Sequence, residues 1–280
     1  TGYAKQDTIS GDDKHFGWRL GRFFLTGFTR VTADENQQPV FIKTLGDSVT
    51  LWFDLEQDID ALNGNAQLSL AADANGYDQQ FGIPKTNFGR GTLIVRHTDY
   101  QNAKNEPAVY TDYLLAKGTT GANARIVLHE EGDYEVALDY EVQDSELTHI
   151  TSKFGNYRIF LRFSIRNGNC MVYPFDLLTG AELQNTSVAE AGFSLDLARS
   201  RYLDINVRRA VLVETANGVI EDARFNRPAK DGDRYTQEGI YTISVSNRYT
   251  GESTTKTIFV GSQELLETYV RNGFSLERLK

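Results

Sequence analysis

The fold is decided by residues 238–261, EGIYTISVSNRYTGESTTKTIFVG, where apolar and polar side chains alternate on both sides of a turn. Tyr241, Ile243 and Val245 face one side of the first strand, and the Thr and Ser residues between them face the other. The segment NRYTG then leads into a second, Thr-rich strand at 254–260. Two strands of this composition joined by a glycine-containing turn predict a β-hairpin.

The beginning of this hairpin has an earlier counterpart in the chain. Residues 131–134, EGDY, repeat the E-G-x-Y pattern of residues 238–241 and again begin an alternating strand, at 134–142. In Greek-key sandwiches a tyrosine near the start of a late strand often hydrogen-bonds back across a corner. We therefore interpret Tyr134 and Tyr241 as structural tyrosine corners of two related sandwich domains. Chance is the alternative, because G-x-Y is a common pattern.

Length and composition indicate a globular protein with buried cores. The 280 residues are enough for two ordinary domains, and 40% of them are hydrophobic. The net charge is −9, with acidic and basic residues interspersed, which argues against nucleic acid and anionic lipid as partners. No apolar run approaches the ~20 residues that span a bilayer, so we expect no membrane insertion by this segment.

The beginning of the chain and its single cysteine bear on location. The sequence starts TGYAKQDTISGDDK, without an initiator Met or an apolar signal core, so we interpret it as a mature or trimmed segment. Cys170 is the only cysteine, which excludes an intrachain disulfide. We expect a buried, unreactive thiol there. A secreted protein without disulfides fits a Gram-positive surface, and a cytosolic location stays compatible.

The pattern along the chain predicts two domains and a terminal helix. The polar segment 179–192 carries the predicted boundary, which gives a larger, loop-rich domain at 1–180 and a smaller one at 181–262. Residues 263–280 are expected to form a helix capped by Ser262 and to begin a further segment. Three interruptions are predicted between strands: a loop at 73–91, a polar insertion at 143–156, and a hairpin turn at Asn167-Gly168 into residues 170–173.

The run DGDRYTQEGIYTISVSNRYTGESTTKTIFVG, at 231–261, resembles the last half of bacterial immunoglobulin-like domains of the Big type. Those domains carry G-x-x-[FY]-T-x-x-G-x-Y-T-[IV]-x-V, a short turn and a T-T-x-x-[IV] strand. The matching residues are Gly232, Tyr235-Thr236, Gly239, Tyr241-Thr242-Ile243, Val245 and Thr254-Thr255. The clear resemblance covers about residues 200–261, and the first half resembles the family only through 131–142. It implies an all-β chain of two tandem immunoglobulin-like antiparallel β-sandwiches with a short C-terminal helix.

No sequence motif predicts catalysis or a cofactor. The four histidines form neither H-x-H nor H-x-x-x-H, and the nucleotide-binding and G-x-S-x-G motifs are absent. An EF-hand reading of the loop after Asp73 fails because Pro84 stands where the bidentate Glu belongs. A looser calcium site at Asp231 and Asp233 is the one metal alternative. We expect no catalytic residue and no enzyme, although a hydrolase with two carboxylates in the long loops stays an alternative.

Aromatic residues supply the candidate binding site. Trp52 lies on the polar face of its predicted strand, and Tyr77, Phe88 and Tyr100 lie in or near long loops. Exposed aromatic rings stack on sugars or anchor protein partners. The alternative is that such residues fold under their own loops as a satellite core. The insertion at 143–156 is a second candidate, because loops at one end of a sandwich often bind ligands.

These observations favour a non-catalytic extracellular or cell-surface module. As the resemblance implies, it would act as a spacer and as an adhesive region for a glycan or for a host or cell-wall protein. A carbohydrate-binding accessory region of a glycan-degrading enzyme is the second hypothesis. The sequence specifies neither the ligand nor the oligomeric state.

Overall fold

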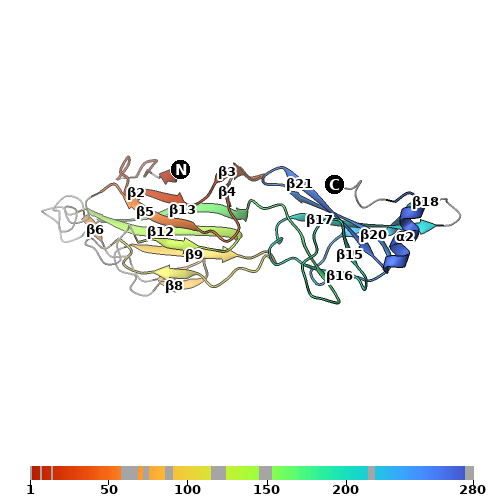
Figure 1. Ribbon diagram of the computed structural model, residues 1–280. Helices are drawn as coiled ribbons and strands as arrows, with labels where there is room; N and C mark the ends of the chain where they lie inside the picture. The colour runs from red at the N-terminus through yellow and green to blue at the C-terminus, as the bar shows by residue number, and fades with distance from the viewer. Residues whose placement is uncertain are drawn as a thin grey trace. The chain divides into compact units, whose positions relative to one another are not determined.

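The computed structural model divides the chain into two compact units: unit 1, Thr1–Asn167, and unit 2, Gly168–Lys280. It describes residues 2–6, 8–13, 15–57, 69–71, 76–85, 91–114, 124–144, 153–213 and 218–274. Each unit has its own sheets (Figure 1) and its own hydrophobic core. The division lies before the predicted one at 180/181, because residues 173–176 form a strand in a sheet of unit 2.

Unit 1 is a β-sandwich. One sheet has the order β1-β2-β5-β11, formed by Tyr3–Gln6, Gly21–Thr26, Val49–Leu55 and Ile126–Leu128. The other has the order β10-β9-β12-β13-β4-β3, formed by Ala108–Tyr110, Thr92–Thr98, Gly132–Asp144, Lys153–Asn167, Pro39–Lys43 and Arg30–Ala33. Strand β6 (Ser69–Ala71) also pairs with β12, and β7 (Gly76–Asp78) and β8 (Ile83–Lys85) form a separate hairpin.

Unit 2 is built from two further sheets and a helix. The smaller sheet has the order β14-β16-β19, formed by Tyr173–Asp176, Phe193–Asp196 and Arg234–Tyr235. The larger has the order β15-β21-β20-β17-β18, formed by Ser187–Ala189, Glu252–Val260, Gly239–Asn247, Asp204–Val213 and Gly218–Pro228. Helix α2, Gln263–Arg271, is the only helix within the described ranges.

The two units share one strand order. In unit 1 the neighbours β10-β9-β12-β13-β4 correspond in sequence order and pairing to β18-β17-β20-β21-β15 in unit 2. The last pair is parallel in both cases, β13 with β4 and β21 with β15, whereas the other pairs are antiparallel. The second sheets correspond as β2-β5-β11 and β14-β16-β19. Strands β1, β3, β6, β7 and β8 are additions of unit 1.

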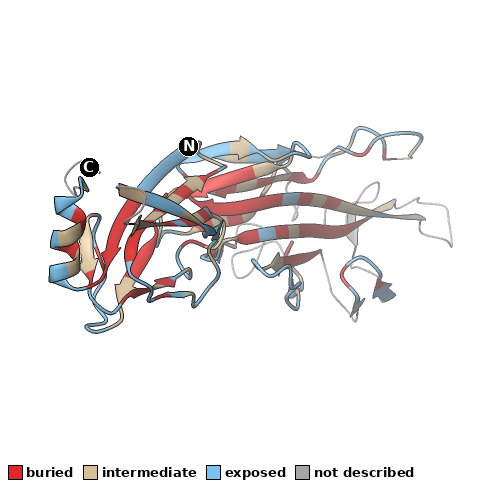
Figure 2. Ribbon diagram, turned by 90° about the vertical axis from the view of Figure 1, so that its right-hand side faces the viewer, coloured by how far each residue is buried: buried red, intermediate tan, exposed pale blue. Residues whose placement is uncertain are grey.

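Alternating side chains build both cores. Strand β2 alternates between buried and half-buried residues, and Phe23 and Leu25 face the core. In β20, Tyr241, Ile243 and Val245 are buried in the core of unit 2, as the opening pattern predicts. Figure 2 shows the buried residues concentrated in the central strands and on the inner side of the helix. The fold is therefore mostly β, as predicted.

Helix α2 packs as part of unit 2. Ser262 caps it, accepting a hydrogen bond from the Leu265 amide at 3.2 Å. Leu266 and Tyr269 pack against Ile240 of β20 and Phe259 of β21. Since Ile240 and Phe259 alternate with the core-facing residues of their strands, the helix covers the outer face of the five-stranded sheet.

The three predicted interruptions differ from the structure. Asn167 ends β13, and the chain passes into unit 2 instead of turning back as a hairpin. The predicted loop at 73–91 contains the β7–β8 hairpin. Of the predicted insertion at 143–156, residues 143–144 and 153–156 belong to β12 and β13, and 145–152 lie outside the described residues. Glycine and polar residues thus concealed the short β7–β8 hairpin and the paired ends of β12 and β13.

Candidate functional site

The tyrosine corner of unit 1 is held by two hydrogen bonds from side chains. Tyr134 Oη donates to the Glu130 carbonyl at 2.6 Å, four residues earlier. His97, which pairs with Tyr134 across β9 and β12, donates from Nε2 to the Glu131 carbonyl at 2.8 Å. Gly132, which lies between Glu131 and Tyr134 in sequence, has φ of 155°. A Cβ at this position would collide with the His97 ring. Glycine is therefore required at this turn.

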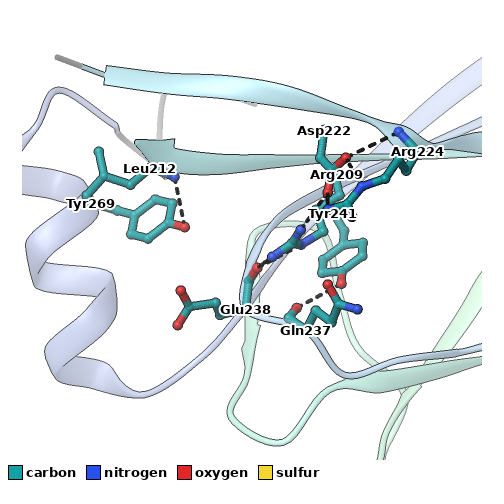
Figure 3. A network of polar contacts seen from close by, with 8 residues as sticks. All are labelled: Arg209, Leu212, Asp222, Arg224, Gln237, Glu238, Tyr241 and Tyr269. Carbon is teal, nitrogen blue, oxygen red and sulfur yellow. Dashed lines mark hydrogen bonds and ion pairs between the residues drawn. The ribbon is translucent and has the colours of Figure 1, made fainter. Parts of the chain in front are cut away.

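The corner of unit 2 repeats this arrangement (Figure 3). Tyr241 Oη donates to the Gln237 carbonyl at 2.8 Å, again four residues earlier. Arg209, the cross-strand partner of Tyr241, donates from Nε to the Glu238 carbonyl at 2.8 Å. Gly239 has φ of 138°. The two corners thus provide donors to backbone carbonyls at equivalent positions. The second donor is a histidine in unit 1 and an arginine in unit 2.

Side chains around the second corner form a wider polar network (Figure 3). Arg209 Nη1 lies 3.0 Å from Asp222 Oδ2, and Arg224 pairs with the same carboxylate. The hydrogen bond from Arg224 lowers the pKa of Asp222 to about 2. Past the pairing of Ala210 with Ile240, near the start of β20, Tyr269 Oη accepts a hydrogen bond from the Leu212 amide at 3.1 Å. A helix side chain therefore accepts the hydrogen bond of a β17 amide that has no partner in β20.

The β7–β8 hairpin covers the outer face of the larger sheet in unit 1. Phe81, in its turn, is only 4% exposed and packs against Ile94 of β9 and Ala137 of β12. Both partners alternate with residues of the main core, so they point to the opposite side of the sheet. Phe81 thus forms a small second core beneath its own hairpin.

Ion pairs fasten this hairpin to the sheet. Arg158 of β13 binds Asp78 of β7 and, at 2.6 Å, Asp139 of β12. The guanidinium carbons of Arg96 and Arg158 lie 5.0 and 5.4 Å from the centre of the Phe81 ring. One arginine thus pairs with both Asp78 and Asp139 and links the hairpin to β12 and β13.

Trp52 lies on the outer face of β5, opposite Leu51 and Phe53, as predicted. Its ring contacts Phe24 of β2, with centroids 4.7 Å apart and planes tilted by 51°. The guanidinium carbon of Arg125 lies 3.6 Å from the centre of the indole ring. A cation therefore covers one face of Trp52, which is consistent with a cation–π contact within the protein.

The other candidate aromatic residues lie elsewhere. Tyr77 of β7 is 57% exposed, and Tyr100, in the turn after β9, is 43% exposed. The hairpin that carries Tyr77 lies on the outer face of the larger sheet, whereas Trp52 lies on the outer face of the smaller one. Trp52 and Tyr77 thus occupy opposite sides of unit 1 and form no common strip. Phe88 falls outside the described residues.

A polar trio, formed by the buried Lys43 and Asn167 and the half-buried Glu131, escapes prediction from the sequence. Lys43 and Asn167 pair across the parallel strands β4 and β13, two residues beyond Phe41 and Ile165 of the core. Their side chains therefore lie on the core face, and they are 2% and 7% exposed. Lys43 Nζ donates to Asn167 Oδ1 at 2.5 Å. Glu131 accepts from Asn167 Nδ2 at 2.8 Å and from the Asn167 amide at 2.9 Å.

Burial changes the proton affinities within this trio. It lowers the pKa of Lys43, against the opposing charges of Glu131 and Asp47. It also raises the pKa of Glu131, against the hydrogen bonds from Asn167 and the charges of Arg166 and Lys43. Both shifts favour the neutral forms. No sequence spacing indicates the trio, because Lys43 and Asn167 come from two strands far apart in the chain and Glu131 lies just before a third.

The sequence offers Asp231 and Asp233 as an alternative calcium site. Asp231 accepts hydrogen bonds from Arg201 at 3.0 Å and from the Leu197 amide at 3.3 Å, and Asp233 accepts one from the Lys230 amide at 2.9 Å. Among the residues that the structure describes, no three His, Cys, Asp or Glu side chains are grouped to hold a metal ion.

Cys170 is buried, as expected. Over the same described ranges, no helix has the length and apolar character needed to cross a membrane.

Comparison with known proteins gives no family for the chain. Neither a protein-family model nor a curated protein sequence matches it.

Proposed function

We propose that this chain is a non-catalytic, immunoglobulin-like segment of a secreted or surface-attached bacterial protein, where it acts as a spacer with an adhesive surface. The observation that supports this best is the repetition of one eight-strand order and one tyrosine corner in both units. Repeated sandwiches with separate cores are suited to adding length, since each unit can fold around its own core. The Big-type run at 231–261 supports the bacterial, extracellular setting.

The location can be tested on the native protein. Cells that produce it are treated with an external protease, and the cell-wall, medium and cytosolic fractions are probed with an antibody against the chain. We expect the protein in the medium or in a protease-accessible wall fraction. A cytosolic enzyme followed in the same fractions controls for lysis. Recovery of the chain only from the protease-protected cytosol would contradict the proposal.

Adhesion to a glycan is the second candidate, and Tyr77 is the residue that favours it. Its ring is exposed on the β7–β8 hairpin, whereas one face of Trp52 is covered by Arg125. Aromatic faces that remain open can stack on sugar rings. The full chain is applied to a glycan array, where Tyr77→Ala should lose retention and Tyr77→Phe should keep it. Equal retention by the chain and by Tyr77→Ala would remove this site from consideration.

A further inference from the structure

The trio of Lys43, Glu131 and Asn167 brings an amine, a carboxyl group and a carboxamide into direct contact. The Asn167 side chain lies between the other two, at 2.5 Å from the lysine nitrogen and 2.8 Å from the nearer glutamate oxygen. The parallel pairing of β4 with β13 fixes Lys43 beside Asn167, and the Asn167 amide holds the second Glu131 oxygen. Such fixed proximity can replace a bimolecular encounter.

The buried setting favours reactive protonation states. A neutral lysine amine is a nucleophile, and burial lowers the pKa of Lys43. A neutral carboxylic acid can donate to a carboxamide oxygen, and burial raises the pKa of Glu131. Transfer of one proton from Lys43 to Glu131 produces both neutral groups. The Asn167 carboxamide can then turn over, so that its oxygen accepts from the Glu131 acid.

We propose that Lys43 and Asn167 become joined by an intramolecular isopeptide bond, with Glu131 as the catalytic residue. The Lys43 Nζ lone pair attacks Asn167 Cγ while Glu131 donates a hydrogen bond to Oδ1. The Nζ–Cγ bond forms, the Cγ–Nδ2 bond breaks, and Nδ2 leaves as ammonia. Glu131 passes the proton released by Nζ to the leaving nitrogen and ends as it began. Nothing is oxidised or reduced, and no further reactant is consumed.

Unit 2 shows that the fold does not require this trio. Asn167 lies two residues beyond Ile165, the partner of the corner residue Gly132. Gly239 pairs with Val260 in unit 2, so the corresponding position is Ser262. Lys43 likewise lies two residues beyond Phe41, the parallel partner of Ile165. In unit 2 the equivalent parallel pair is Ala189 with Val260, so Ala191 stands at the position of Lys43.

Only Glu238, the counterpart of Glu131, is kept. The same strands and corner thus form without the amine and the carboxamide, which favours a chemical role in unit 1.

The bond is detected by the intact mass of the full chain after denaturation. We expect a mass lower than that of the sequence by one ammonia. A protease digest should then contain one branched peptide that includes both Lys43 and Asn167. Lys43→Arg and Glu131→Gln should restore the full sequence mass and abolish the branched peptide. Lys256→Arg is the matched control, because Lys256 is also buried but its Nζ donates to the Val172 and Leu183 carbonyls. The loss of ammonia should persist in this variant.

One competing reaction must be separated from this one. The Gly168 amide can attack the Asn167 side chain and form a succinimide, which also loses ammonia but does not involve Lys43. A loss that persists in Lys43→Arg, without a branched peptide, would therefore overturn the proposal. So would a wild-type chain with the full sequence mass, whether or not any variant folds. The result does not depend on where the protein resides, so it is independent of the proposed function.

Discussion

At the scale of single residues, the two tyrosine corners are the most closely matched features of the units. In each, the hydroxyl satisfies the carbonyl four residues earlier, and the cross-strand partner satisfies the next carbonyl. Both tyrosines are also packed in their cores, Tyr134 at 4% exposure and Tyr241 at 0%. The hydroxyl and the ring therefore stabilise the corner separately.

Removing the hydroxyl alone should weaken each unit. We expect Tyr134→Phe and Tyr241→Phe each to lower the free energy of unfolding by about 1 kcal/mol, because the corner carbonyl loses its donor while the buried ring is kept. Denaturant titration of the full chain measures this change. Tyr77→Phe, which alters an exposed hydroxyl, is the control and should have little effect. Equal stability of all three variants and the wild type would show that the hydroxyl bonds contribute nothing.

The sequence reveals only part of each corner. Tyr134 and Gly132 can be predicted because the hydrogen bond from Tyr134 to the Glu130 carbonyl spans only four residues, and the glycine lies between them in sequence. The second donor cannot be predicted from the sequence pattern, because it comes from a neighbouring strand. It also differs between the units: His97 in unit 1 and Arg209 in unit 2. The polar trio is hidden for the same reason: Lys43 and Asn167 are 124 residues apart in the chain.

At the scale of elements, the β7–β8 hairpin is the main addition that unit 1 makes to the shared strand order. It is small, so its own hydrogen bonds cannot keep it folded. Its position depends on Phe81 and on the ion pair of Asp78 with Arg158. The segment is rich in glycine and lacks alternation, which is why the sequence predicts a loop there. Contacts with β9 and β12, which no local pattern encodes, determine the strands instead.

We expect Phe81→Ala to release the hairpin without unfolding the sandwich. Loss of a buried phenylalanine ring removes about 3–5 kcal/mol of packing, which corresponds to a rise in amide exchange of at least on the order of 100-fold where opening is local. Hydrogen exchange of residues 76–85 measures this, and β12 amides should keep their protection. Tyr77→Ala is the matched control, because it removes an exposed ring from the same hairpin. Unchanged exchange in Phe81→Ala would show that Phe81 does not hold it.

At the scale of the whole molecule, both units bury tyrosine hydroxyls that must stay protonated. Burial raises the pKa of Tyr113 in unit 1 to about 12 and that of Tyr241 in unit 2 to about 12. Tyr113 Oη donates to the Ala124 carbonyl at 2.8 Å and accepts from the Phe53 amide at 3.2 Å. The phenol thus bridges two backbone groups in unit 1, as Tyr241 completes the corner in unit 2.

These shifts predict that both units lose stability in alkaline solution. Below the unfolded pKa of 10.0, both states hold the proton and the tyrosines contribute no pH dependence. Above it the unfolded chain releases the proton first, so the free energy of unfolding should fall by up to about 1.4 kcal/mol per pH unit for each tyrosine until the folded pKa is reached. Urea titrations at a series of pH values, with tyrosinate absorbance followed in parallel, measure the slope. Tyr113→Phe should make the slope shallower, because it removes one of the raised pKa values. A free energy of unfolding that stays constant as the pH rises from about 10 to 12 would contradict the burial of these hydroxyls in both units.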